Sequence, residues 1–107
     1  MQRDQYIRRI KQASRIPHGR LPTRKVDNGL IRITVAILRK IVHGRGKMIN
    51  RFPELCAAAI SWAQMCYACD CASNLKITLP TTESQLQHEG ARDTLLSVAL
   101  DLEELYN

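Results

Sequence analysis

The 107-residue sequence predicts an all-α protein, a small helical bundle formed by a single domain over residues 1–107. Apolar residues recur at helical spacing over three long segments, which is the main indication of amphipathic helices. Prolines and a pair of glycines fall between these segments, where turns are expected. Hydrophobic residues make up 45% of the chain and charged residues 24%, a balance typical of a globular domain with one core.

The N-terminal part predicts a short helix followed by a basic arm. Residues 3–14 place Tyr6, Ile7 and Ile10 on one narrow apolar stripe, and a helix this short needs to dock on a body to persist. In residues 15–28, prolines and a glycine exclude a regular helix, and several basic side chains make the segment an arm.

The first main helix is predicted over residues 28–43. Its middle, residues 31–36, alternates and is β-branched, which taken alone favours a strand. Over the longer window the apolar residues fall within about 200° of arc, as on one side of a helix. A strand of this length without a turn would be unusual, so a helix is expected. Asp27 or Asn28 can cap its start, and Gly44 can end it in the left-handed conformation.

The second main helix is predicted over residues 53–72. Pro53 and Glu54 suit a first helical turn, because proline there loses no hydrogen bond and a carboxylate favours the positive helix end. The remainder is apolar on nearly all sides, which is typical of a helix packed by neighbours on several faces. The residues expected at the centre of the bundle, or of a subunit interface, are Leu55, Ala59, Ile60, Ala63 and Cys66.

The last main helix is predicted over residues 82–105, after an extended connector. Residues 75–79 alternate like a strand, but no partner strand is evident, and an isolated pair would be marginal. Thr82 and Gln85 have the spacing of a capping box, which opens a helix. The expected apolar face is formed by Ala91, Leu95, Val98, Ala99, Leu102, Leu105 and Tyr106.

The two halves of the chain differ strongly in charge. Residues 1–51 contain 14 lysines and arginines and two acids, whereas residues 52–107 contain two basic residues and eight acids. An asymmetry of this size indicates a polyanionic partner for the basic half. The alternative is that basic and acidic faces neutralise each other within one fold.

The candidate phosphate-binding residues are basic side chains of the arm, of helix 28–43 and of the turn that follows it: Arg20, Arg24, Lys25, Arg32, Arg39, Arg45 and Lys47. Arg32 and Arg39 share one ridge, which meets either an acidic surface of the last helix, such as that of Asp93, Asp101 and Glu104, or a phosphate-rich partner.

The turn over residues 44–47 offers a second kind of anion contact. Its glycines allow backbone amides to approach an anion, although the spacing is not that of a nucleotide-hydrolase loop. The alternative is a plain helix cap followed by a solvated basic turn.

The amino-acid sequence shows no feature that would recognise a specific base sequence. The helix after the turn presents Glu54, Ala57 and Ser61 near its start, and these side chains cannot read a major groove. Tyr6 alone is available in the basic half for stacking on single-stranded bases. Any nucleic-acid contact is therefore expected to be made to the backbone, with little sequence preference.

The cysteines are expected to be structural thiols. Cys66 and Cys69 lie inside an apolar helix without a glycine turn, and no second pair completes a zinc site with Cys56 or Cys71. A metal site, a redox pair and a disulfide are the alternatives. No metal and no cofactor are expected, and no serine, cysteine or histidine has a recognisable catalytic partner, so the protein is not expected to be an enzyme.

Together these patterns predict a cytoplasmic binding protein whose basic half engages phosphate groups of nucleic acid or of a nucleotide ligand. Charges at the N-terminus argue against a signal peptide, and no uncharged stretch reaches membrane-spanning length, so no membrane contact is expected. The alternative is a small inhibitor or adaptor, of the compact type that phages encode, which docks on a charged protein target. Homo-oligomerisation would suit both functions.

Overall fold

The computed structural model describes residues 2–13, 28–70 and 78–106, and every regular element among them is helical. In chain order these elements are α1 (Arg3–Ala13), α2 (Asn28–His43), α3 (Lys47–Arg51), α4 (Pro53–Asp70), the 3-10 turn η2 (Gln85–Gln87) and α5 (Glu89–Tyr106). The all-α bundle is confirmed. The predicted basic arm lies outside the described residues, apart from Asn28.

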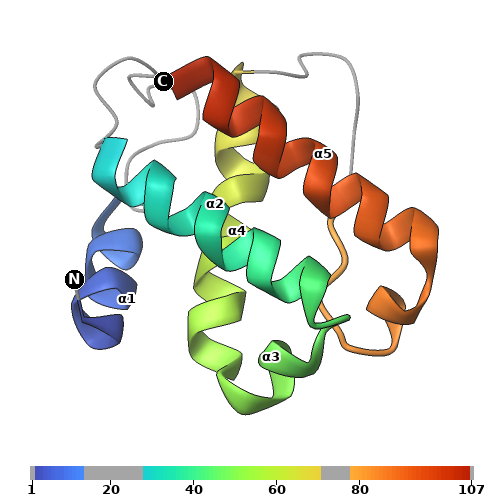
Figure 1. Cartoon of the computed structure of the whole chain (residues 1–107). Helices are drawn as coiled ribbons and strands as arrows, with labels where there is room; N and C mark the ends of the chain where they lie inside the picture. Colours follow the sequence, from blue (N-terminus) through green and yellow to red (C-terminus); the bar gives the residue numbers. More distant parts are fainter. Residues whose placement is uncertain (1, 14–27, 71–77, 107) are drawn as a thin grey trace.

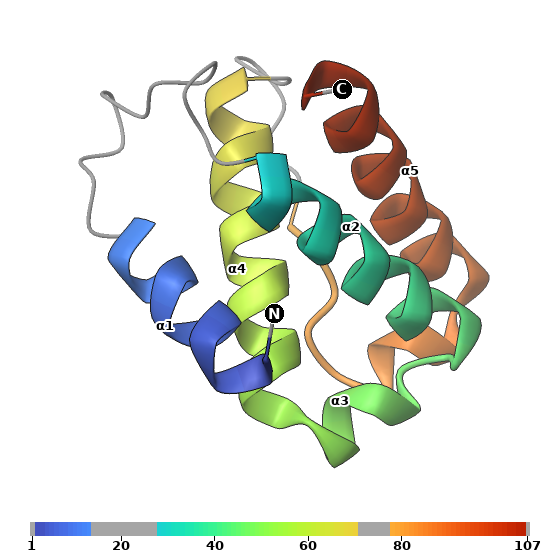
Figure 2. The same cartoon turned by 60° about the vertical axis from the view of Figure 1, so that its left-hand side comes forward.

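α4 is the central helix of the arrangement. It contacts α1, α2, α3 and α5, and Figures 1 and 2 show α2 and α5 running side by side with α4 next to them. Ala59 and Ala63 are fully buried on α4, where their small side chains let neighbouring helices approach closely. The predicted central position of this helix is therefore confirmed, although Leu55 is only half-buried and Ala57 and Ser61 are exposed.

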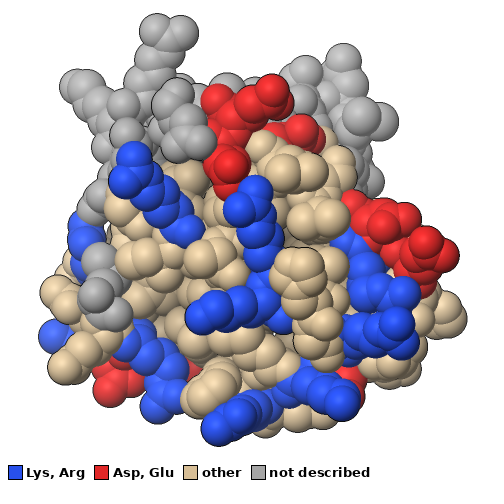
Figure 3. Space-filling view, viewed as in Figure 1, with Lys and Arg blue, Asp and Glu red and all other residues tan. Residues whose placement is uncertain are grey.

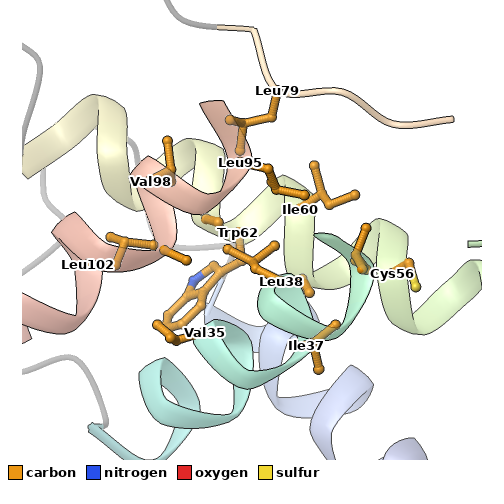
Figure 4. Packing of buried hydrophobic residues seen from close by; sticks show 14 of the residues in the cluster. Val35, Ile37, Leu38, Cys56, Ile60, Trp62, Leu79, Leu95, Val98 and Leu102 are labelled. Atoms are coloured by element: carbon orange, nitrogen blue, oxygen red, sulfur yellow. The ribbon is translucent and has the colours of Figure 1, made fainter. Parts of the chain in front are cut away.

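One hydrophobic core joins the described helices. Figure 4 shows Trp62 of α4 at its middle, close to Val35 of α2 and Leu102 of α5. The Trp62 side chain is 1% exposed, and its Nε1–H has no hydrogen-bond partner among the described residues. An unpaired buried donor costs about 1–3 kcal/mol, which the packing of the indole in the core must offset.

α2 has the predicted bounds, but the left-handed backbone expected at Gly44 occurs at the next two residues instead. The left-handed residues are Arg45 (φ 52°) and Gly46 (φ 87°), and Gly44 is not left-handed. The Gly46 amide donates to the carbonyl of Ile41 over 3.0 Å, which closes the helix end. A Cβ on Gly46 would lie 2.9 Å from the Cα of Glu83, so this close approach requires glycine.

α3 was not predicted: the sequence analysis placed a turn at residues 44–47 and assigned no element to residues 48–52. Lys47 to Arg51 form one short helix that ends at Phe52, whose backbone (φ −132°, ψ 69°) is not helical. A residue before proline is disfavoured in the helical region, which separates α3 from α4. α4 then begins at Pro53, as predicted.

The start of the last helix is a second correction. The capping box forms, since Gln85 N–H donates to Thr82 Oγ1 over 3.2 Å and Thr82 N–H donates to Gln85 Oε1 over 3.1 Å. It opens the 3-10 turn η2, however, and the extended backbone of His88 (ψ 129°) separates this turn from α5. Leu86 of η2 is buried with no exposed surface, so this turn packs against the core.

The connector and the face of α5 agree with the sequence prediction where they are described. Residues 78–81 are neither helix nor strand, and the Leu79 amide donates to Gln64 Oε1 of α4 over 2.9 Å. On α5, Leu95, Val98 and Leu102 are buried as expected. Residues 75–77 and the side chains of residues 105 and 106 lie outside the described part.

Candidate phosphate-binding surface

Four of the seven candidate cations lie in the described part of the chain. Arg32 and Arg39 lie on α2, Arg45 lies in the turn after it, and Lys47 begins α3. The other three, Arg20, Arg24 and Lys25, lie outside the described residues.

Arg32 and Arg39 border one hollow between α2 and α5. The hollow has a volume of about 360 Å³, and its remaining lining is formed by Ile31, Val35, Ala36 and Glu103. Arg39 Nη2 lies 2.8 Å from Glu103 Oε2, and the two side chains are 40% and 39% exposed. Arg32 is exposed and forms no ion pair with a described carboxylate. Among the described residues, the basic ridge thus pairs with the last helix through Glu103, and not through the expected Asp93, Asp101 or Glu104.

The ion pair between Arg39 and Glu103 contributes little to stability. Exposed ion pairs contribute about 0–1 kcal/mol, because water and salt screen both charges. Glu103 therefore offsets only part of the charge of Arg39 in the free protein, and a phosphate can compete with Glu103 for the guanidinium at small cost.

The turn between α2 and α3 offers side-chain charges and no backbone cradle. The amides of Gly44, Arg45, Gly46 and Lys47 donate to the carbonyls of Lys40, Val42, Ile41 and Gly44. The carbonyl of Arg45 accepts a hydrogen bond of 2.9 Å from Gln87 Nε2. These amides are used within the chain, which favours the interpretation of the segment as a helix cap with exposed Arg45 and Lys47 side chains.

A group of residues that the sequence analysis did not single out lies where α1 meets the junction of α3 and α4. The guanidinium carbon of Arg3 is 4.9 Å from the centroid of the Phe52 ring, and that of Arg51 is 5.3 Å from it. Both arginines are exposed and Phe52 is half-buried. The distance of Arg3 from Phe52 along the chain explains why no local pattern indicates this group.

Tyr6 is not available for stacking on bases, contrary to the sequence prediction. Its side chain is 1% exposed, and its hydroxyl lies 2.6 Å from Thr34 Oγ1 of α2. Burial raises the pKa of Tyr6 to about 12. The residue anchors α1 in the core. Its burial could have been predicted from the sequence, because Tyr6 lies on the same apolar stripe of α1 as Ile7 and Ile10.

Cys56 and Cys66 are not in a disulfide, and both have no exposed surface. Burial raises the pKa of Cys56 to about 11, which keeps this thiol protonated and unreactive near neutral pH. Among the side chains that the structure describes, no three of the His, Cys, Asp and Glu residues lie together as metal ligands would. Cys71 and the side chain of Cys69 lie outside that part, so a structural role for all the cysteines stays a prediction.

The histidines do not form a recognisable catalytic group where they are described. His43 at the end of α2 and His88 before α5 are exposed, and His18 lies outside the described residues. The expectation that the protein is not an enzyme stays a prediction. In the described part of the chain, none of the helices combines the length and the apolar character needed to cross a bilayer.

Basic side chains are spread over one face of the molecule. Figure 3 shows lysines and arginines in several groups from the upper left to the bottom of the face that carries α2, α3 and α5, with uncharged surface between them. Acidic side chains lie at the upper middle, along the right-hand edge and at the lower left of this view. No protein family matches the chain, and comparison with curated proteins and with solved structures finds no relative.

Proposed function

We propose that this protein binds the phosphate backbone of nucleic acid with little sequence preference. The observation that carries the proposal is the set of exposed cations on α2, in the following turn and on α3 that form no ion pair with a described carboxylate: Arg32, Arg45 and Lys47. Unneutralised cations on a rigid surface attract phosphates and release the counterions condensed on nucleic acid.

An extended nucleic acid is favoured over a small nucleotide. A nucleotide site needs cations that converge on one pocket. The hollow beside Arg32 and Arg39 also contains Glu103, whose carboxylate opposes a phosphate there. Arg45 and Lys47 do not line that hollow, so the candidate cations as a set suit several phosphates along a chain.

Recognition of base sequence has no support in the geometry. Glu54, Ala57 and Ser61 at the start of α4 line a hollow against α1, together with Ile7 and Ile10. A helix placed this way cannot enter a major groove, and α3 is one short helix of 5 residues. The proposed contacts are therefore to phosphates, which position a protein without specifying a sequence.

Removal of two unpaired cations tests the proposal. Arg32→Gln combined with Lys47→Gln should weaken binding to unrelated duplexes alike and flatten the slope of log affinity against log salt by about 2. Arg39→Gln should flatten it by less, because Glu103 already offsets that charge in the free protein. Unchanged affinity and slope in the double variant would contradict the proposal.

A protein target is the second candidate, and one observation favours it. The hollow between α1 and α4 has a volume of about 520 Å³ and a largely apolar lining that includes Ile7, Ile10, Ala57 and Ala58, with Lys11 and Glu54 beside them. A charged protein that inserts an apolar side chain here would be blocked by Ala57→Arg. Nucleic-acid binding that is absent at physiological salt in the parent chain would favour this candidate.

A further inference from the structure

Arg3, Phe52 and Arg51 form a clamp-like group at the junction of α1, α3 and α4. Both guanidinium groups lie within cation–π distance of the single Phe52 ring, at 4.9 Å for Arg3 and 5.3 Å for Arg51. We propose that these two arginines together hold one backbone phosphodiester of the bound nucleic acid. This inference rests on the proposed function and adds a site outside the predicted cations.

Helix α1 positions Arg3, and the junction of α3 and α4 positions Arg51 and Phe52. Arg51 and Phe52 lie where α3 ends, directly before the Pro53 that starts α4. Arg3 arrives from α1, which docks on the body through the buried Ile7 and through the hydrogen bond between Tyr6 and Thr34. The two arginines are thus brought together by the core rather than by a flexible loop.

The chemistry of the group suits a phosphate. A guanidinium stacked on a ring keeps its N–H edge free, and that planar edge matches phosphate oxygens in a bidentate arrangement. Stacking also orders a side chain that would otherwise lose rotamer freedom on binding. Neither Arg3 nor Arg51 forms an ion pair with a carboxylate in the described part of the chain, so both positive charges are available.

Two carboxylates line the same hollow, which has a volume of about 220 Å³: those of Asp4 and Glu54. They oppose an anion without pairing with either arginine. Glu54→Gln removes one of these charges, and it is therefore expected to tighten nucleic-acid binding.

A polymer is favoured over free phosphate because the two arginines lie next to other exposed cations of the same surface. Lys47 lies one helical turn before Arg51 on α3, so the two side chains are neighbours, and Arg45 precedes Lys47 in the turn. A chain of phosphates can follow this path, whereas a single phosphate would use only one point of it.

A charge-matched pair of variants tests the clamp. Because the two arginines share one phosphate, Arg3→Gln/Arg51→Gln should flatten the salt slope on a short labelled DNA duplex by about 0.9 and lower the affinity by about tenfold or more. The control is Arg8→Gln/Lys40→Gln, which removes the same charge from exposed positions. Arg8 lies about 140° around α1 from Arg3, away from the hollow. The control should leave the slope unchanged.

The outcomes separate the clamp from the wider proposal. If both double variants flatten the slope equally, the clamp is wrong while backbone binding stands. If the parent chain shows no salt-dependent binding, both are wrong.

A third variant tests the stacking itself. Phe52→Leu keeps every charge, so the slope should stay while the affinity falls several-fold, because the guanidinium groups lose the ring that orders them. Circular dichroism checks that the helices remain. Unchanged affinity would overturn the clamp. Inorganic phosphate, added at constant ionic strength, should not displace the duplex; displacement would assign the arginines to free phosphate and overturn the polymer as their ligand.

Discussion

At the residue scale, the contact between Tyr6 and Thr34 shows how a polar pair becomes part of the core. Thr34 Oγ1 donates to the carbonyl of Leu30 over 2.7 Å, so its one hydrogen is already used. The Tyr6 hydroxyl, 2.6 Å away, must then be the donor to Thr34. Thr34 is fully buried, although the spacing of apolar residues alone does not place a threonine in the core.

This order of donors leads to a prediction for two variants. Tyr6→Phe should lower the free energy of unfolding by about 1 kcal/mol, because Thr34 keeps its bond to Leu30. Thr34→Val should cost more, up to about 3 kcal/mol, because it leaves the Tyr6 hydroxyl buried without an acceptor. Chemical denaturation measures both, and a larger loss for Tyr6→Phe would contradict the assigned direction.

The same residue predicts a pH effect. Burial raises the pKa of Tyr6 to about 12, against an ordinary value of 10.0, so the fold favours the neutral phenol. This contribution to stability is present below about pH 10 and is lost as the pH rises toward 12. Tyr6→Phe should therefore lack that part of the alkaline loss of stability. Equal alkaline profiles for parent and variant would be inconsistent with a buried phenol.

Two glycines should respond in opposite directions to alanine. Gly46→Ala places a Cβ 2.9 Å from the Cα of Glu83 at a φ of 87°, so it should lower the melting temperature. At Gly90, in the first turn of α5, nothing lies within 4 Å of the added Cβ. Gly90→Ala should raise stability by about 0.4–1 kcal/mol. Thermal unfolding of the two variants side by side measures the contrast, and a shift in the same direction would contradict it.

At the element scale, the sequence predicts what depends on periodicity and misses what depends on contacts between distant segments. The bounds of α2 and the start of α4 follow from apolar spacing and from Pro53. The turn after α2 could not be predicted, because Gly46 is left-handed where it packs against Glu83 and Leu86, which lie far along the chain. The late start of α5 has the same origin, since Leu86 enters the core.

The central position of α4 is tested by one substitution and its matched control. Ala59 has no exposed surface, so Ala59→Asp buries an unpaired charge and should unfold the protein. Ala57 lies two residues earlier on the same helix and is exposed, so Ala57→Asp should be tolerated. Circular dichroism and gel filtration distinguish the two. A folded Ala59→Asp with an unchanged melting point would contradict this architecture.

The buried thiol of Cys66 gives a milder prediction for the same helix. Cys66→Ala should cost about 1–2 kcal/mol through a small cavity, without loss of nucleic-acid binding. The parent protein should also contain no stoichiometric metal by elemental analysis. One equivalent of zinc would contradict a purely structural role for the cysteines.

At the scale of the whole molecule, the candidate surface is only partly predictable. The charge asymmetry between the halves is visible in the sequence. The candidate cations Arg32, Arg45 and Lys47, which belong to the basic half, are exposed in the structure. The pairing of Arg39 with Glu103 depends on how α2 and α5 pack. The approach of Arg3 to Phe52 depends on how α1 docks, and neither arrangement leaves a local pattern.

The most direct test of phosphate binding is the salt dependence of the affinity of the parent chain for two unrelated DNA duplexes. Each phosphate neutralised by a lysine or arginine contributes about −0.9 to the slope of log affinity against log salt. Contacts from α1, from α2 and from the segment between α2 and α4 should give a slope of about −3 or steeper, equal for both sequences. A slope near zero, or tight binding to one sequence only, would contradict the account.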